Sequence, residues 1–124
     1  MGGLPRLIDH VKLPVTDLAR SRAFYSAALR PFGYGLVYEG DESLGYGPPE
    51  LEPLALQRAE HVTTGTHVAF SCESRDTVDA FHAAALAAGG VDNGAPGPRP
   101  YGGEYYAAFV LDPDGHNLEA VYHG

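Results

Sequence analysis

The chain has 124 residues, of which 44% are apolar and 19% charged, which predicts one soluble globular domain over residues 1–124. Eight basic and sixteen acidic side chains give a net charge of −8, which argues against nucleic acid as a partner because phosphate binding needs a concentrated basic surface. No apolar run is long enough to cross a membrane, no signal peptide is recognisable, and the single cysteine excludes an internal disulfide, so a cytoplasmic location is expected.

The first half of the chain predicts a strand, a helix and three further strands. Residues 7–15 (LIDHVKLPV) favour a strand, and Thr16 and Asp17 can cap the helix that follows it. Pro31 and Gly33 end this helix. Three strand-like segments separated by turn residues then follow: 34–40 (YGLVYEG), 43–47 (SLGYG) and 51–58 (LEPLALQR).

The second half predicts the same order. Residues 66–72 (THVAFSC) favour a strand, and Ser74 can cap a helix that places its apolar residues on one face and ends at Gly89 and Gly90. A connection rich in glycine and proline is expected next. Two antiparallel strands, Tyr105–Leu111 and Asn117–Tyr122, are then joined by a turn over Asp112–Gly115, whose sequence Asp-Pro-Asp-Gly is typical of such turns.

An internal repeat relates the two halves. Residues 10–33 align without a gap on residues 67–90, and the identical positions include His10 with His67, Phe24 with Phe81 and Gly33 with Gly90. The fold class is therefore α+β, with tandem βαβββ modules over about residues 5–60 and 65–123. Because each module alone would leave one face of its sheet bare, the two mixed sheets are expected to close into a cup.

The segments IDHV (8–11), THVAF (66–70) and FVLDPDGHNLEAV (109–121) resemble the vicinal oxygen chelate superfamily of glyoxalase I, bleomycin-resistance proteins and extradiol dioxygenases. The resemblance covers about residues 7–123. It implies that His10, His67 and Glu119 bind one divalent metal ion, with Fe(II) or Mn(II) favoured over Ni(II) or Zn(II). Two histidines and one carboxylate leave open positions for a small substrate that chelates the ion through adjacent oxygens. Two alternatives to a metal site remain. The three residues could be unrelated polar residues near strand ends, or they could form a vestigial site that no longer binds a metal ion.

Glyoxalase-type sites carry a fourth ligand in the last strand of the first module. Leu54, Ala55 and Leu56 occupy the centre of that strand here and cannot bind a metal ion, and Glu52 could serve only in a shifted register. A metal-dependent dioxygenase is therefore favoured over a lyase or isomerase. The alternative is a metal-free protein that sequesters a drug or other ligand, as bleomycin-resistance proteins do. The resemblance also implies a homodimer, and it leaves open whether the modules pair within or between chains.

The segment 96–109 (PGPRPYGGEYYAAF) is placed by the resemblance near the mouth of the pocket. Its tyrosines could stack on a substrate or donate a proton, or they could fill the core. Strand alternation allows only one of Tyr105 and Tyr106 to face the metal, and Tyr106 is taken with Tyr101 as the catalytic candidates. Arg99 could bind a substrate carboxylate, or it could simply be solvated. His116 is expected to face solvent.

Overall fold

A computed structural model describes residues 8–63 and 65–124. The elements form two units in the order that the sequence predicts, with one additional strand, β6. The first unit contains β1 (Val11–Val15), α1 (Leu18–Ala28), the short 3-10 helix η1 (Arg30–Phe32), β2 (Gly35–Glu39), β3 (Ser43–Gly47) and β4 (Leu54–Arg58). The second contains β5 (His67–Cys72), α2 (Arg75–Ala87), β6 (Val91–Pro98), β7 (Tyr106–Leu111) and β8 (Asn117–Tyr122).

The predicted helix caps are confirmed. The Asp17 side chain accepts a hydrogen bond from the backbone N–H of Arg20 at 3.0 Å, which satisfies one of the free donors at the start of α1. Ser74 does the same for α2. Gly33 follows the first helical segment with φ +79°, in the left-handed region that glycine adopts without strain, and so ends it.

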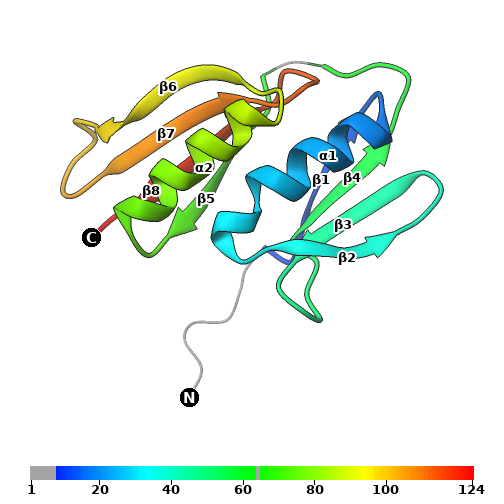
Figure 1. The fold of residues 1–124 in the computed structure, drawn as a ribbon, viewed down its shortest axis with the longest axis horizontal. Helices are drawn as coiled ribbons and strands as arrows, with labels where there is room; N and C mark the ends of the chain where they lie inside the picture. Colours follow the sequence, from blue (N-terminus) through cyan, green and yellow to red (C-terminus); the bar gives the residue numbers. More distant parts are fainter. Residues whose placement is uncertain (1–7, 64) are drawn as a thin grey trace.

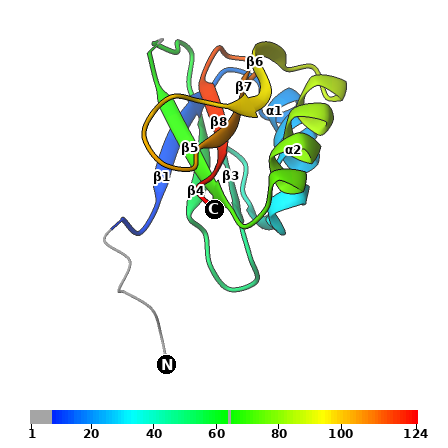
Figure 2. The same ribbon diagram turned by 90° about the vertical axis from the view of Figure 1, so that its left-hand side faces the viewer.

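Each unit forms one four-stranded mixed sheet. The strand orders are β1-β4-β3-β2 and β5-β8-β7-β6, and in each sheet only the first pair is parallel. The two sheets lie side by side in one layer, and both helices cover the same side of that layer (Figures 1 and 2). We call the face of each sheet that is turned away from the helices its open face. No described helix is long and apolar enough to span a membrane.

The buried residues form one core that both units share. It includes Leu13 and Leu56 from the first sheet, Phe24 from α1, Phe81 from α2 and Leu118 from the second sheet, all at most 2% exposed. These side chains alternate along the strands with residues on the open faces. The α+β class built from two βαβββ units is confirmed.

Strand β6 was missed by the sequence interpretation, which placed a connection rich in glycine and proline there. Residues Val91–Pro98 pair antiparallel with β7 instead, with two irregularities in the register around Gly94. Because β6 is the edge strand of its sheet, it has a hydrogen-bonded neighbour on one side only. The missing N–H groups of Pro96 and Pro98 are therefore tolerated there.

The turn between β7 and β8 connects the two units. The N–H of Gly115 donates to the carbonyl of Asp112 at 2.9 Å, which confirms the predicted turn. The Asp112 carboxylate is 3% exposed and accepts hydrogen bonds from the hydroxyl of Tyr25 in α1, at 2.5 Å, and from the N–H groups of Asp114 and His116. We call residues 112–116 the Asp112–His116 turn.

The prediction that His116 faces solvent is wrong. Its side chain is 1% exposed, and its Nε2 donates to the carbonyl oxygen of Pro14 in β1 at 2.7 Å. Asp114 adds to this contact between the turn and the first unit by accepting hydrogen bonds from both the N–H and the hydroxyl of Thr16. The turn therefore holds the start of β8 against the end of β1.

Candidate functional site on the second sheet

Two of the three predicted metal ligands meet on the open face of the second sheet. His67 is the first residue of β5, and Glu119 is the third of β8, where it pairs with Ala69 in parallel register. Since alternate residues share a face, His67, Ala69 and Glu119 all lie on the open side. The Nε2 atom of His67 lies 2.8 Å from Oε1 of Glu119.

The burial of Glu119 is unusual for a carboxylate inside an apolar strand. Its side chain is 2% exposed, whereas that of His67 is 48% exposed. A buried carboxylate is stable only if hydrogen bonds, cations or metal ions compensate for lost hydration. Glu119 has such partners at both oxygens, because the hydroxyl of Tyr105 donates to Oε2 at 2.5 Å.

Tyr105 is held in place by its neighbours on the open face. The rings of Tyr101 and His123 contact it edge-on, at centroid distances of 4.9 and 5.0 Å. The hydrogen bond to Glu119, and to a smaller extent burial, raises the pKa of Tyr105 to about 12. The hydroxyl therefore stays protonated near neutral pH and remains a donor to the carboxylate.

Tyr106 lies on the opposite face of the sheet, as the alternation of neighbouring residues requires. Its hydroxyl donates to Asp79 of α2 at 2.7 Å, and the guanidinium of Arg75 lies over its ring. The choice of Tyr106 as the tyrosine at the site is thus corrected, because Tyr105 is the one that reaches Glu119.

The structure does not bring His10 to the other two predicted ligands. His10 precedes β1 on the first sheet, its side chain is 52% exposed, and its Nδ1 lies 2.8 Å from Oδ1 of Asp9. Among residues 8–63 and 65–124, no group of three or more His, Cys, Asp or Glu side chains is placed to hold a metal ion. The described part of a single chain therefore brings together two of the three predicted ligands, His67 and Glu119.

Arg99 is already engaged by the backbone. Its guanidinium donates to the carbonyl oxygens of Gly97 at 2.9 Å and Ala95 at 2.8 Å, and it lies over the ring of Phe109. These contacts leave it less able to bind a substrate carboxylate than the sequence interpretation supposed. Tyr101 is 61% exposed at the rim of the same face, where it is accessible to a ligand.

Glu52 lies on the open face of the first sheet although it precedes β4. Its carboxylate covers Gly45, whose paired residue Ala55 faces away from the helices, and a side chain at position 45 would collide with it. The sequence interpretation admitted Glu52 as a ligand only in a shifted register. Glu52 nevertheless reaches the open face, because Gly45 in β3 has no side chain to block it.

The sequence and the fold are similar to those of several known proteins. Residues 7–120 match the family described as the glyoxalase/bleomycin resistance protein/dioxygenase superfamily. A glyoxalase/bleomycin resistance protein from Albidiferax ferrireducens T118 is 31% identical, with 94% of this chain and 99% of that chain covered and a TM-score of 0.86.

Two other solved structures extend the comparison. A glyoxalase-related enzyme from Fulvimarina pelagi shares the fold at 24% identity, with a TM-score of 0.75 and coverage of 95% of this chain and 88% of that chain. A V278E mutant of glyoxalase I from Zea mays is 26% identical, with a TM-score of 0.68, over 92% of this chain and 43% of that chain. Among curated proteins, none matches the sequence.

Proposed function

Because the chain belongs to the glyoxalase/bleomycin resistance protein/dioxygenase superfamily, we propose that it is a metal-dependent enzyme whose site forms around His67 and Glu119. The observation that carries this proposal is the contact between the buried Glu119 carboxylate and the half-exposed imidazole of His67, at 2.8 Å on an open sheet face. The superfamily includes many enzymes, glyoxalase I among them, and this chain shares their fold.

His67 and Glu119 fit a divalent metal ion. Neutral imidazole and carboxylate are ligands that Fe(II), Mn(II), Ni(II) and Zn(II) accept, with Fe(II) or Mn(II) favoured here for a facial triad. With metal–ligand bonds of about 2.1 Å, adjacent ligand atoms lie about 3 Å apart, close to the observed 2.8 Å. Tyr105 donates to Oε2 of Glu119, so Oε1, the oxygen that contacts Nε2 of His67, is the one that would bind an ion.

We propose that a second chain supplies His10. The open faces of both sheets lie on the side away from the helices, where a second molecule can approach them (Figure 2). In a two-fold symmetric dimer, a contact between His10 of one chain and the His67–Glu119 pair of the other occurs twice, which gives one complete site per chain. This arrangement would supply the third ligand to the two that a single chain brings together.

The proposed substrate is a small molecule with adjacent oxygens, such as a catechol-like diol or an α-hydroxycarbonyl compound. A bound divalent ion would supply Lewis-acid stabilisation of the substrate oxygens. The chain itself would orient Glu119 through Tyr105 and offer the exposed ring of Tyr101 for stacking. Dioxygenase chemistry is favoured over lyase or isomerase chemistry, because the centre of β4 carries no ligand; Glu52 is the residue that would reverse this choice.

Metal content tests the proposal. Untagged protein prepared without chelators should contain close to one ion per chain, and Glu119→Ala or His10→Ala should contain almost none. His61→Ala, at an exposed histidine between the units, is the matched control and should retain the ion. A full complement of metal in His10→Ala would remove His10 from the site, and no metal in the wild type after reconstitution would refute the enzyme proposal.

Mixing the two inactive variants tests the shared site directly. If His10 acts across the dimer, unfolding and refolding His10→Ala together with Glu119→Ala restores one intact site in each mixed dimer. Random pairing makes about half of the dimers mixed, so the mixture should bind about 0.25 ion per chain. If each site belongs to one chain, the mixture binds as little as its parents.

A metal-free binding protein is the second candidate function. The aromatic side chains of Tyr101, Tyr105 and His123 cluster on the open face, and the described part of one chain brings no three metal ligands together. Such a surface could hold a drug-like ligand by stacking. Divalent metal ions should raise the melting temperature if the enzyme proposal is correct, because a ligand of the folded state stabilises it. A metal-free sequestering protein would show no shift.

A further inference from the structure

A cavity of about 650 Å³ lies between the two sheets, separate from the His67–Glu119 pair. Strands β1 and β5 border it, and each is an edge strand with a hydrogen-bonded neighbour on one side only. The size lies within the range of small-molecule sites. Neither His67 nor Glu119 lines this cavity.

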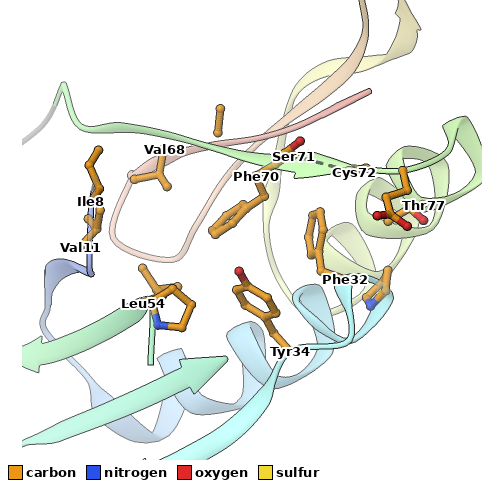
Figure 3. Close-up of a pocket in the computed structure, with 14 residues that line it drawn as sticks. Ile8, Val11, Phe32, Tyr34, Leu54, Val68, Phe70, Ser71, Cys72 and Thr77 are labelled. Atoms are coloured by element: carbon orange, nitrogen blue, oxygen red, sulfur yellow. Dashed lines mark hydrogen bonds between the residues drawn. The ribbon is translucent and has the colours of Figure 1, made fainter. Parts of the chain in front are cut away.

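Most of the side chains that line the cavity are apolar, and some of them are aromatic (Figure 3). The ring of Phe32 lies 5.3 Å from that of Phe70, and Tyr34 meets Phe70 edge-on at 6.5 Å. Val11 and Leu54 form the aliphatic end. A flat ring fits such a wall, because aromatic groups pack in edge-on and offset arrangements at these distances.

The charges of the described residues at the cavity disfavour an anionic ligand. Among residues 8–63 and 65–124, no lysine, arginine or histidine lines the cavity, and Glu73 is the carboxylic acid in its wall. A carboxylate or phosphate would therefore lose its hydration without gaining a cationic partner. The net charge of −8 acts in the same direction.

Among the labelled side chains in Figure 3, that of Tyr34 points its hydroxyl into the middle of the cavity. Its hydroxyl has no hydrogen-bond partner within residues 8–63 and 65–124, whereas the hydroxyls of Tyr25, Tyr46 and Tyr105 all have one. Pockets for small molecules commonly combine an apolar wall with a few such groups, which fix the orientation of the ligand.

We propose that this cavity binds a neutral, planar aromatic molecule carrying one hydroxyl or carbonyl oxygen. The ring would pack against Phe32 and Phe70, and the oxygen would pair with the hydroxyl of Tyr34. Both units contribute to the wall, so the ligand would also hold the two sheets in a fixed relation. The site does not depend on the proposed metal centre.

The test uses 2-naphthol as the probe, titrated into the full chain in the presence of EDTA and followed by isothermal titration calorimetry. We expect saturable binding of one molecule per chain. Tyr34→Phe keeps the ring and should weaken 2-naphthol binding about 5- to 10-fold, the usual effect of one neutral hydrogen bond. Tyr38→Phe, at a tyrosine that is 53% exposed and outside the cavity, should change nothing.

Three further measurements separate this site from others. Glu119→Ala should bind 2-naphthol as the wild type does, which distinguishes the cavity from the metal centre. Val68→Trp fills the cavity from the edge strand β5 and should abolish binding, while circular dichroism verifies its fold. Naphthalene, which lacks the oxygen, should bind wild type and Tyr34→Phe equally.

Absence of saturable binding, equal binding of anionic 2-naphthoate, or unchanged affinity in both Tyr34→Phe and Val68→Trp would overturn the proposal.

Discussion

Removal of the Tyr25 hydroxyl should weaken the contact between α1 of the first unit and the Asp112–His116 turn of the second. Tyr25 is fully buried, and its hydroxyl lies 2.5 Å from Oδ2 of Asp112, whereas both backbone donors to this carboxylate bond Oδ1. Tyr25→Phe keeps the ring and leaves Oδ2 without its donor. Hydrogen bonds to charged groups contribute about 1.5–3 kcal/mol, so we expect the free energy of unfolding to fall by about 2 kcal/mol.

Tyr46→Phe is the matched control. Tyr46 is equally buried, but its hydroxyl bonds the neutral oxygens of Ser26 and Arg22, so its loss should cost about 1 kcal/mol. Urea denaturation at pH 7, followed by circular dichroism at one protein concentration, measures both variants. The reasoning is refuted if Tyr25→Phe loses no more stability than Tyr46→Phe.

The same hydroxyl predicts a dependence on alkaline pH. Burial, and next the negative charge of Asp112, raise the pKa of Tyr25 well above its ordinary value of about 10. Above pH 10 the unfolded chain loses a proton that the folded chain keeps, so stability is complete below pH 10 and falls as the pH rises further. Tyr25→Phe should flatten this decline, and equal slopes in both proteins between about pH 10 and 11 would contradict the assignment.

Two further pairs of variants test neighbouring parts of the molecule. Tyr105→Phe should weaken divalent-metal binding about 10-fold or more by freeing Glu119, whereas Tyr106→Phe on the other face should leave it unchanged in calorimetric titrations. Gly47→Ala should lower the free energy of unfolding by about 1–3 kcal/mol, because the added carbon meets backbone atoms of the loop before β4. Gly45→Ala should be milder, since only a flexible side chain must move; the reverse order in urea denaturation would contradict this.

Features set by neighbouring residues were predictable from the sequence. The Asp-Pro-Asp-Gly turn fixed the hairpin, and strand β8 has the predicted bounds Asn117–Tyr122. The polar start of each helix identified its cap, because only a few side chains can satisfy the free N–H groups there. The internal repeat placed His67 and Glu119 in strands, where their pairing follows from the parallel register of β5 and β8.

Features that depend on context were harder to predict. Strand alternation separates Tyr105 from Tyr106 but does not say which face carries the site, so the choice between them could only be settled by the register with β8. Strand β6 carries glycine and proline residues that disfavour strands in general, and only its edge position makes them acceptable. A signal for the missed role of Tyr105 did exist, because a buried Glu119 requires a donor from the same face.

The position of His10 shows where local patterns stop being informative. The repeat makes His10 equivalent to His67, but equivalent positions in two units are close only if the units dock with those strands facing each other. Here α1 packs against α2 in the shared core. The Asp112–His116 turn of the second unit bonds to Tyr25 in α1 and to Pro14 in β1 of the first unit. These contacts set the two open faces side by side (Figure 2). Within the described residues, His10 does not join the His67–Glu119 pair as a third ligand. A docking that buries the core within one chain thus leaves the His67–Glu119 pair without a third ligand in the described residues, and this is why the proposed site requires a second chain.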